Sequence, residues 1–352
     1  MSFLTVHNVV IRGIAVCVPS TVEENLTFPL FEEGEAERVI KSTGIHRKHV
    51  VSAGTTTSDL CVPAVNRLLQ ELGWSTESVD ALIFASSSRD YITPSTSCIL
   101  QDRLHLSEHV FTMDIPFGCT GWVHGMSVLS SLLSSGEMKR GLLLAGDTST
   151  TMTYPGDKEA RSLFGDAGTV TALEYSSEAE TPVFFTFGTE GKNYEAIIVR
   201  DGGSRHPVTE ESLKPIEYRK NIVRRNIDCV MEGVDVFVFS GIRGTQCVND
   251  LCEHFHIDES EIDYFLFHQA NRYMTERIRK KLKIDPAKVP YSLQDYGNTS
   301  CASIPLTVVT QCAEEYRKRK INSVACAFGV GLCWGGICFT TDKIICPDLV
   351  EF

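Results

Sequence analysis

The sequence of 352 residues predicts an α/β protein built from two similar halves. Short apolar runs, such as 81–85 and 264–267, are each followed by a polar loop and a helical pattern. Such runs are typical of buried parallel strands, and their alternation with helices predicts βαβ units with right-handed crossovers. The pattern also occurs twice, because residues 78–106 read like residues 260–284.

The segments that follow these two stretches match as well. Each predicts a strand, a glycine-containing turn, a helix and a further strand, and the Gly-Cys-Thr turn at 118–120 aligns with the Gly-Asn-Thr turn at 297–299. We therefore expect an N-terminal half of residues 1–177 and a C-terminal half of residues 178–352, with an insertion at about 178–235. The same match is also compatible with the alternation of strands, turns and helices that is common to α/β chains.

Composition and charge exclude several classes of protein. Hydrophobic residues make up 43% and charged residues 22% of the chain, as is usual for a globular protein. The net charge of −12 argues against nucleic acid as the main partner. No run approaches the ~18 apolar residues of a membrane span, so we expect no membrane partner.

The cysteines and the N-terminus indicate a compartment. The chain has 13 cysteines, an odd number, and no CxxC pair, which favours reduced thiols over a disulfide framework or a zinc site. We therefore expect no metal. The first residues alternate like a strand and lack the basic start of a signal peptide. Together these features predict a cytoplasmic protein.

Cys119 is the candidate nucleophile. It lies between Gly118, which permits a sharp turn, and an expected helix at 120–133. A cysteine at a helix N-terminus meets unpaired N–H groups, so we expect a lowered thiol pKa and a thiolate that can accept an acyl group. Taken alone, a buried structural cysteine is the commoner reading.

His268 and Asn298 are the candidate partners of Cys119. His268 follows the expected strand at 263–267 and can donate a hydrogen bond or move a proton. Asn298 lies in a turn signature and can donate a hydrogen bond without acting as a base. For a lone histidine, the structural interpretation of His268 as a satisfied residue at a helix start is favoured. Asn298 alone can be a turn residue or a helix N-cap.

A functional role is better supported for the three residues as a set than for any one of them, because ligands of open α/β sheets bind beyond the carboxyl ends of strands. If the halves pack about a pseudo-twofold axis, all three side chains converge on one crevice. The glycine-rich stretch at 328–336 adds backbone N–H groups that can form an oxyanion hole. Cysteine, histidine and asparagine also occur in papain-like proteases, but the sequence around Cys119 does not resemble such a nucleophile.

The motifs in their order resemble the β-ketoacyl-acyl-carrier-protein synthase III family of the thiolase superfamily. The resemblance covers nearly the whole chain, and the ordered set is far more specific than any one motif. The motifs are TGIHRKHV (43–50), PSTSCILQ (94–101), DIPFGCTGW (114–122), LFGDAG (163–168), GGSRHP (202–207), HQAN (268–271), YGNTS (296–300) and FGVGLCWGG (328–336).

The resemblance implies a thiolase-like fold with αβαβα layers, a homodimer and a two-step decarboxylative Claisen condensation. Cys119 would take an acyl group from acyl-CoA or acyl-carrier protein, and malonyl-acyl-carrier protein would lose CO₂. His268 and Asn298 would hydrogen-bond the thioester oxygen as enolate charge develops. The backbone N–H groups of Cys119 and Val330 would hold the oxyanion. No cofactor is implied beyond CoA or phosphopantetheine thioesters as substrates.

The binding of the carrier or of CoA is where the sequence departs from the family pattern. Arg38 stands near the place of a tryptophan before TGI, Lys158 stands for an arginine before FGD, and Arg272 comes one position early. These departures leave the acyl donor open. The basic stretch after HQAN is either a solvated helix face or a dock for an acidic carrier or CoA phosphates. Its candidate residues are Arg272, Arg279, Lys280 and Lys281.

Two other functions compete with condensation. An acyltransferase of the same fold would pass the acyl group to an alcohol or amine, with His268 as base and no need for Asn298. A non-catalytic partner in a synthase complex would not need Cys119. The retention of both residues favours carbon–carbon bond formation. By their positions relative to the motifs, Tyr91, Ile92, Thr93 and Tyr154 are candidates for the pocket wall or for the core.

Overall fold

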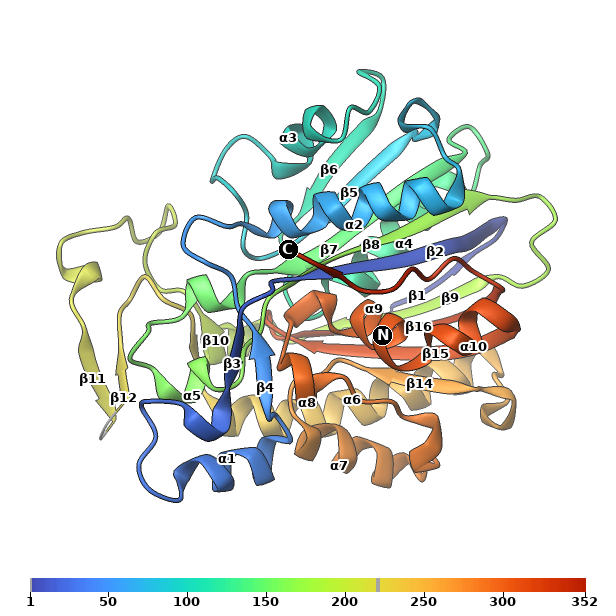
Figure 1. Cartoon of the computed structure of the whole chain (residues 1–352). Coiled ribbons are helices and arrows are strands. Elements are labelled where there is room, and N and C mark those ends of the chain that lie inside the picture. Colours follow the sequence, from blue (N-terminus) through green and yellow to red (C-terminus); the bar gives the residue numbers. More distant parts are fainter. Residues whose placement is uncertain (1, 220–221) are drawn as a thin grey trace.

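A computed structural model describes residues 2–219 and 222–352, which form an α/β molecule of five layers around two sheets (Figure 1). One sheet has six strands in the order β17-β2-β8-β7-β5-β6, and the other has five in the order β1-β9-β16-β15-β14. The predicted α/β class and thiolase-like layering are confirmed. Within the described ranges, no helix has both the length and the apolar composition needed to cross a membrane.

The six-stranded sheet is buried on both faces. Successive side chains of its central strands enter different cores, because side chains alternate along a strand. Leu142 and Leu144 pack beneath the outer helices, whereas Leu143 faces the space between the two sheets. The strands are β2 (Val9–Val18), β5 (Ala81–Ala85), β6 (Phe111–Ile115), β7 (Arg140–Asp147), β8 (Ala167–Tyr175) and β17 (Val350–Glu351).

The five-stranded sheet carries the C-terminal half. The predicted strand at 264–267 is its edge strand β14, which runs parallel to β15. Its remaining pairs are antiparallel, so the sheet is mixed. Its strands are β1 (Ser2–Val6), β9 (Val183–Thr189), β14 (Tyr264–Phe267), β15 (Lys320–Gly329) and β16 (Cys333–Asp342).

Helices form the other three layers. The outer face of the six-stranded sheet is covered by α2 (Thr57–Leu72) and α3 (Thr96–Arg103), and that of the five-stranded sheet by α6 (Gly233–Phe255) and α7 (Arg272–Leu282). The middle layer, between the sheets, consists of α4 (Gly121–Leu133), α9 (Ser303–Thr307), a π-helical turn (Val308–Cys312) and α10 (Ala313–Lys318).

Smaller elements surround the open ends of the sheets. The strand pairs β3–β4, β10–β13 and β11–β12 are each two-stranded and antiparallel. They are β3 (Val22–Glu24), β4 (Arg47–His49), β10 (Ile197–Ile198), β11 (Ile216–Arg219), β12 (Ile222–Arg224) and β13 (Val230–Met231). The short helices are α1 (Glu35–Thr43), α5 (Lys158–Arg161) and α8 (Leu293–Tyr296).

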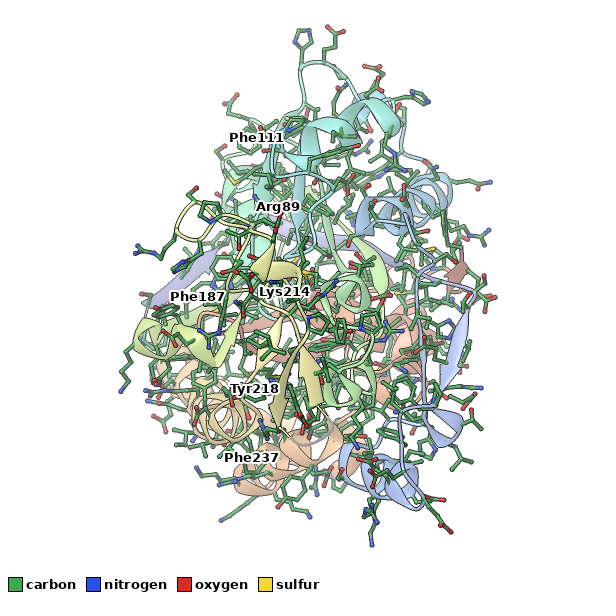
Figure 2. All side chains as sticks on the ribbon, turned by 90° about the vertical axis from the view of Figure 1, so that its left-hand side faces the viewer. Arg89, Phe111, Phe187, Lys214, Tyr218 and Phe237 are labelled. Carbon is green, nitrogen blue, oxygen red and sulfur yellow. The ribbon has the colours of Figure 1, made fainter. Side chains whose placement is uncertain are left out.

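The expected segment boundaries need correction at three places. The expected insertion at about 178–235 contains β9, which pairs with β1 and β16 inside the five-stranded sheet. The chain outside the sheets is therefore shorter and includes the paired strands β11 and β12, whose region Lys214 and Tyr218 mark in Figure 2. The ends also cross, since β1 lies in the C-terminal sheet and β17 in the N-terminal sheet. The repeat is incomplete too, because α8 stands where a strand was expected before Gly297.

Candidate active site

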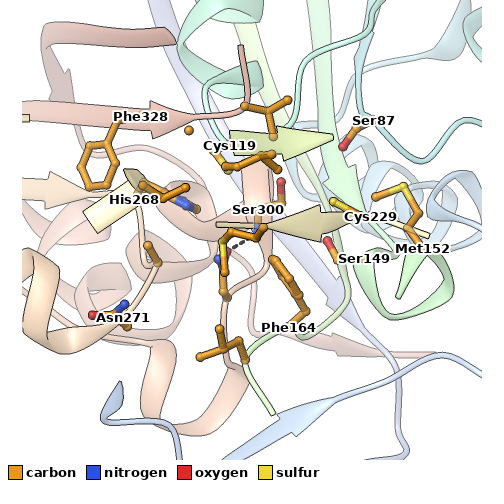
Figure 3. Close-up of a pocket in the computed structure, with 18 of the residues that line it drawn as sticks. Ser87, Cys119, Ser149, Met152, Phe164, Cys229, His268, Asn271, Ser300 and Phe328 are labelled. Carbon is orange, nitrogen blue, oxygen red and sulfur yellow. Dashed lines mark hydrogen bonds between the residues drawn. The ribbon is translucent and has the colours of Figure 1, made fainter. Parts of the chain in front are cut away.

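One cavity contains the sulfur, imidazole and carboxamide that the sequence singled out. Cys119, His268 and Asn298 all line it, together with Val330, although they come from both halves of the chain (Figure 3). The cavity has a volume of about 70 Å³. The structure therefore brings together every residue predicted for the condensing centre. Cys119 and His268 meet there although about 150 positions separate them in the sequence.

Cys119 lies just ahead of α4, in the turn that follows β6. A methyl group on Gly329 would lie 2.5 Å from the Cys119 sulfur, so only glycine lets the chain pass so close to it. A hydrogen bond between the sulfur and the Val330 backbone acts to lower the pKa of the thiol. The Val330 N–H therefore points at the place where the reaction would occur.

The charge state of Cys119 differs from our expectation. We expected the helix N-terminus to lower the pKa of the thiol, but burial raises that pKa to about 12. The negative charge of Asp147 acts in the same direction, whereas the Val330 backbone and the Ser300 hydroxyl oppose it. Without substrate the sulfur is a neutral thiol at pH 7.

Asp147 is a fully buried carboxylate at the end of β7. Its Oδ1 accepts hydrogen bonds from Ser86 Oγ at 2.9 Å and from the backbone N–H groups of Ser87 and Ser88 at 2.8 and 3.0 Å. These donors satisfy the buried carboxylate oxygen by hydrogen bonds. Ser87 also lines the cavity, so the carboxylate lies behind the wall next to Cys119.

His268 follows β14 and is almost completely buried. Burial lowers the pKa of its imidazole to about 4, although a hydrogen bond with the Ser300 backbone acts to raise that pKa. The ring is therefore neutral at pH 7. Its Nδ1 lies 2.8 Å from Ser303 Oγ, which also accepts the Gln269 N–H at 3.4 Å. This arrangement favours the tautomer in which Nε2 carries the proton and can donate it.

Asn298 is fixed through its backbone to the FGD motif. Its N–H donates to Leu163 O at 2.8 Å, and its carbonyl accepts the Gly165 N–H at 3.1 Å. Its side-chain Oδ1 accepts the Ser300 N–H at 2.9 Å. Because that bond occupies the oxygen, the amide group Nδ2 is the part of the side chain left to donate a hydrogen bond. The FGD motif therefore positions Asn298.

Ser300 and Ser303 are site residues that the sequence analysis missed. Ser300 lines the cavity next to Cys119, and Ser303 holds the imidazole of His268. Ser300 is the last residue of the YGNTS motif and Ser303 follows three residues later, yet serine is so common in turns and helix starts that the residue type alone assigns neither a role.

The rest of the cavity wall is mostly apolar. Of the residues proposed for the wall, Tyr91 and Ile92 are 62% and 80% exposed, while Tyr154 stacks with Arg225. None of these three lines the cavity, and neither does Thr93. The apolar wall consists of Met152, Leu163, Phe164, Ile197, Cys229, Met231, Val236, Met274 and Phe328.

The residues predicted to bind CoA or a carrier lie outside the cavity. Lys158 forms an ion pair of 2.7 Å with Glu35, and Arg279 pairs with Glu276 at 2.8 Å and donates to the Ile284 carbonyl. These two cations are thus committed to neighbours in the folded chain.

The remaining basic candidates are exposed on two helices that touch each other. Arg38 lies on α1, while Arg272, Lys280 and Lys281 lie on α7. A methyl group on Gly44, at the end of α1, would lie 2.8 Å from the Arg272 side chain, so the two helices meet there. The Arg272 guanidinium stacks over Tyr291 at 4.9 Å. Arg272 therefore lies at the start of α7, close to Met274 of the cavity wall, whereas Lys280 and Lys281 lie in the last turn of the same helix.

Comparison with known proteins shows the family. The model described as 3-oxoacyl-[acyl-carrier-protein (ACP)] synthase III matches residues 113–191, and the model of its C-terminal part matches residues 252–341. The chain is 30% identical over 323 residues to a β-ketoacyl-[acyl-carrier-protein] synthase III of Clostridium perfringens, with 92% of this chain and 96% of that one covered.

Solved structures agree. A 3-oxoacyl-(acyl-carrier protein) synthase of Burkholderia xenovorans superposes with a TM-score of 0.93 at 33% identity, over 100% of this chain and 99% of that one. A second structure, a 3-oxoacyl-(acyl-carrier-protein) synthase III, gives a TM-score of 0.90 at 31% identity and covers 95% and 99%. These matches establish that the chain belongs to the β-ketoacyl-acyl-carrier-protein synthase III family.

Proposed function

We propose that the protein is a condensing enzyme that joins an acyl thioester to malonyl-acyl-carrier protein through an acyl-Cys119 intermediate, in the synthesis of fatty acids or related acyl chains. The observation that carries the proposal is the convergence of Cys119, His268 and Asn298 on one cavity. The printed names of relatives such as those of Clostridium perfringens, Fusobacterium nucleatum and Burkholderia xenovorans, which are β-ketoacyl- or 3-oxoacyl-acyl-carrier-protein synthases, support it.

In the first step the Cys119 sulfur attacks the acyl thioester, and the released thiol takes the proton that Cys119 gives up. Negative charge develops on the carbonyl oxygen during the attack. The backbone N–H groups of Cys119 and Val330 are the donors assigned to that oxygen, because Val330 already points its N–H at the sulfur. A well-placed donor of this kind lowers the barrier by about 3 kcal/mol.

In the second step the malonyl thioester loses CO₂, and its enolate carbon attacks the acyl-Cys119 carbonyl. The Nε2 proton of neutral His268 and the Nδ2 group of Asn298 are assigned to the enolate oxygen. Loss of CO₂ supplies the electron pair, so no strong base is needed. Because the pKa of His268 is lowered to about 4, the imidazole enters this step neutral and offers its Nε2–H as a hydrogen-bond donor.

Transfer of the acyl group to an alcohol or amine is less well supported. That reaction needs His268 as a general base, but Asn298 has no part in it. Here Asn298 Oδ1 is held by Ser300 so that the amide group remains available as a donor. This arrangement supports an oxyanion or enolate rather than a heteroatom nucleophile.

The proposed partners are acyl-carrier protein, acyl-CoA and a second copy of the chain. The basic surface of Arg38, Arg272, Lys280 and Lys281 supports the docking of an acidic carrier or of CoA phosphates near the cavity. Strand β6 ends the six-stranded sheet, and the side chain of Met113 on it is 39% exposed. A homodimer that pairs two β6 strands would cover this edge.

The proposed location is the cytoplasm. The structure contains 13 free cysteines, from Cys17 to Cys346. Free thiols in this number are typical of a reducing compartment, where acyl-thioester chemistry is also possible.

The test is a panel of acyl donors read by mass spectrometry. Acyl-CoAs and acyl-carrier proteins of increasing chain length should add one acyl mass to the intact protein, on the peptide that contains Cys119. The variant Cys119→Ala should gain no mass. Acylation of another residue, or acylation followed by product formation without release of CO₂ from malonyl-carrier protein, would refute the proposal.

A further inference from the structure

Ser300 contacts each of the three residues of the condensing centre. Its backbone N–H donates to Asn298 Oδ1 at 2.9 Å, and its backbone forms a hydrogen bond with the His268 imidazole. Its hydroxyl acts to lower the pKa of the Cys119 thiol, as a donor close to the charged sulfur does. The side chain lines the cavity next to Cys119 (Figure 3).

The backbone of Ser300 is held in a conformation that serine rarely adopts. Its φ is +51°, in the left-handed region that favours glycine. Non-glycine residues in this region cluster at active sites, where surrounding contacts hold them. A glycine at position 300 would keep the turn at lower cost, so the side chain itself is the feature that needs explaining.

We propose that Ser300 is a further catalytic residue, whose hydroxyl donates a hydrogen bond to the Cys119 sulfur while the acyl group is transferred. This role rests on the proposed function, and it concerns the first of the two steps. Among the described residues, the Val330 backbone and the Ser300 hydroxyl are the two groups whose hydrogen bonds favour the charged sulfur.

The need for such a donor follows from the surroundings of Cys119. Burial of the thiol raises its pKa, and the fully buried carboxylate of Asp147 opposes a second negative charge nearby. Neutral donors must therefore stabilise the developing thiolate, and the serine hydroxyl is a mobile donor that can follow the sulfur as its charge changes.

The step balances without any further reactant. The S–H bond of Cys119 and the C–S bond of the incoming thioester break, while the new bond between sulfur and acyl carbon forms. The proton that leaves Cys119 ends on the released thiol. Ser300 keeps its own proton throughout, because it donates a hydrogen bond and does not transfer the proton.

The experiment measures the reactivity of the Cys119 thiol directly. Alkylation of Cys119 by iodoacetamide is followed by peptide mass spectrometry from pH 6 to pH 10, in the wild type, Ser300→Ala and Ser300→Gly. Cys98 is exposed and its sulfur lies 3.6 Å from Thr112 Oγ1, so its peptide serves as an internal reference in each digest. Loss of the hydroxyl should lower the rate at Cys119 by about tenfold near neutral pH and move its pH profile upward by about one unit.

The two variants separate the hydroxyl from the backbone. Both lack the hydroxyl, but glycine also relieves the left-handed φ, so Ser300→Gly stays informative if Ser300→Ala folds poorly. Equal slowing in both variants, with Cys98 unchanged, supports the proposal. Wild-type rates and pH profiles at Cys119 in both variants would overturn it. Absence of acylation in the wild type would instead refute the proposed function, since alkylation needs no acyl substrate.

Discussion

The two glycine turns of the repeat, at 118–120 and 297–299, occupy corresponding places in the two halves but are built differently. The first runs directly into α4, an unbroken helix of 13 residues that presents Cys119. The second follows a single helical turn, α8, and leads through a 3₁₀ turn into α9 and a π-helical turn. The middle helix of the C-terminal half is thus interrupted where the middle helix of the N-terminal half is regular.

The difference in regularity between the two helices corresponds to the number of side chains that each turn places in the cavity. The first turn presents one nucleophile, which the start of a regular helix can hold. The second presents both Asn298 and Ser300, two residues apart, and a regular helix would point them in different directions. Left-handed Ser300 and the irregular helix bring both to the cavity. The two halves therefore share the position of the turn, and the irregular backbone of the second turn brings the donors of Asn298 and Ser300 to the cavity.

The sharpest test of this division separates the two chemical steps. Asn298→Ala should leave self-acylation within about twofold and lower malonyl decarboxylation by about 100–1000-fold, the usual cost of one lost donor to an oxyanion. Cys119→Ala should do the reverse and abolish acylation while decarboxylation persists. The measurements are intact-protein mass and release of labelled CO₂.

The control for this test is Asn298→Asp. It keeps the Oδ1 atom that accepts the Ser300 N–H, but it cannot donate a hydrogen bond. If Asn298→Asp retains decarboxylation while Asn298→Ala loses it, Asn298 acts by holding Ser300 and its assigned role is wrong. Equal loss of both steps in either variant would show that the two turns do not divide the work.

The same comparison shows what the sequence can and cannot predict. Strands β5 and β14 and the start of α4 were predictable because their apolar runs are local and continuous. Cys119, His268 and Asn298 were predictable because each follows such an element in a recognisable motif. Ser300 was missed because its left-handed φ depends on the fold around it.

Pairing between distant segments also escaped prediction. Strand β1 pairs with β9, about 180 residues away, and β17 returns from the C-terminus to β2. Neither pairing has a local signal. The thiol pKa was mispredicted for a related reason: the helix N-terminus is visible in the sequence, whereas burial of Cys119 and the position of Asp147 are not.

Substitution of the glycine in each turn should change the free energy of unfolding, and this effect is of intermediate size. Gly297 has φ +68° and ψ −160°, a region that is almost exclusive to glycine, and a methyl group there would lie 2.8 Å from the Leu163 carbonyl oxygen. Gly297→Ala should therefore lower the free energy of unfolding by about 1–3 kcal/mol, as measured by urea denaturation.

Gly118→Ala is the matched variant in the other turn. Its φ is not positive, and the nearest atoms to an added methyl group are the hydroxyl oxygens of Ser87 and Ser300, at 3.1 and 3.3 Å. Because side-chain hydroxyls can move aside, Gly118→Ala should lower the free energy of unfolding by less than about 1 kcal/mol. The rate of alkylation of Cys119 should change, because the hydroxyls of Ser87 and Ser300 are displaced. Equal destabilisation by both variants would contradict the structural difference between the turns.

The smallest expected effect concerns Lys280 and Lys281, in the last turn of α7, on the surface proposed to receive the carrier. Lys280→Glu with Lys281→Glu should raise the KM for malonyl-carrier protein about three- to tenfold and leave small acyl-CoA substrates nearly unchanged, because only the carrier spans this surface. The effect should shrink in 0.5 M salt, which screens charges in water. Lys318→Glu with Lys320→Glu, on α10 and β15, is the control and should change neither KM. An equal change for the carrier and for small thioesters would indicate that the basic face of α7 is only a solvated helix surface, and that the carrier approaches the cavity from another side.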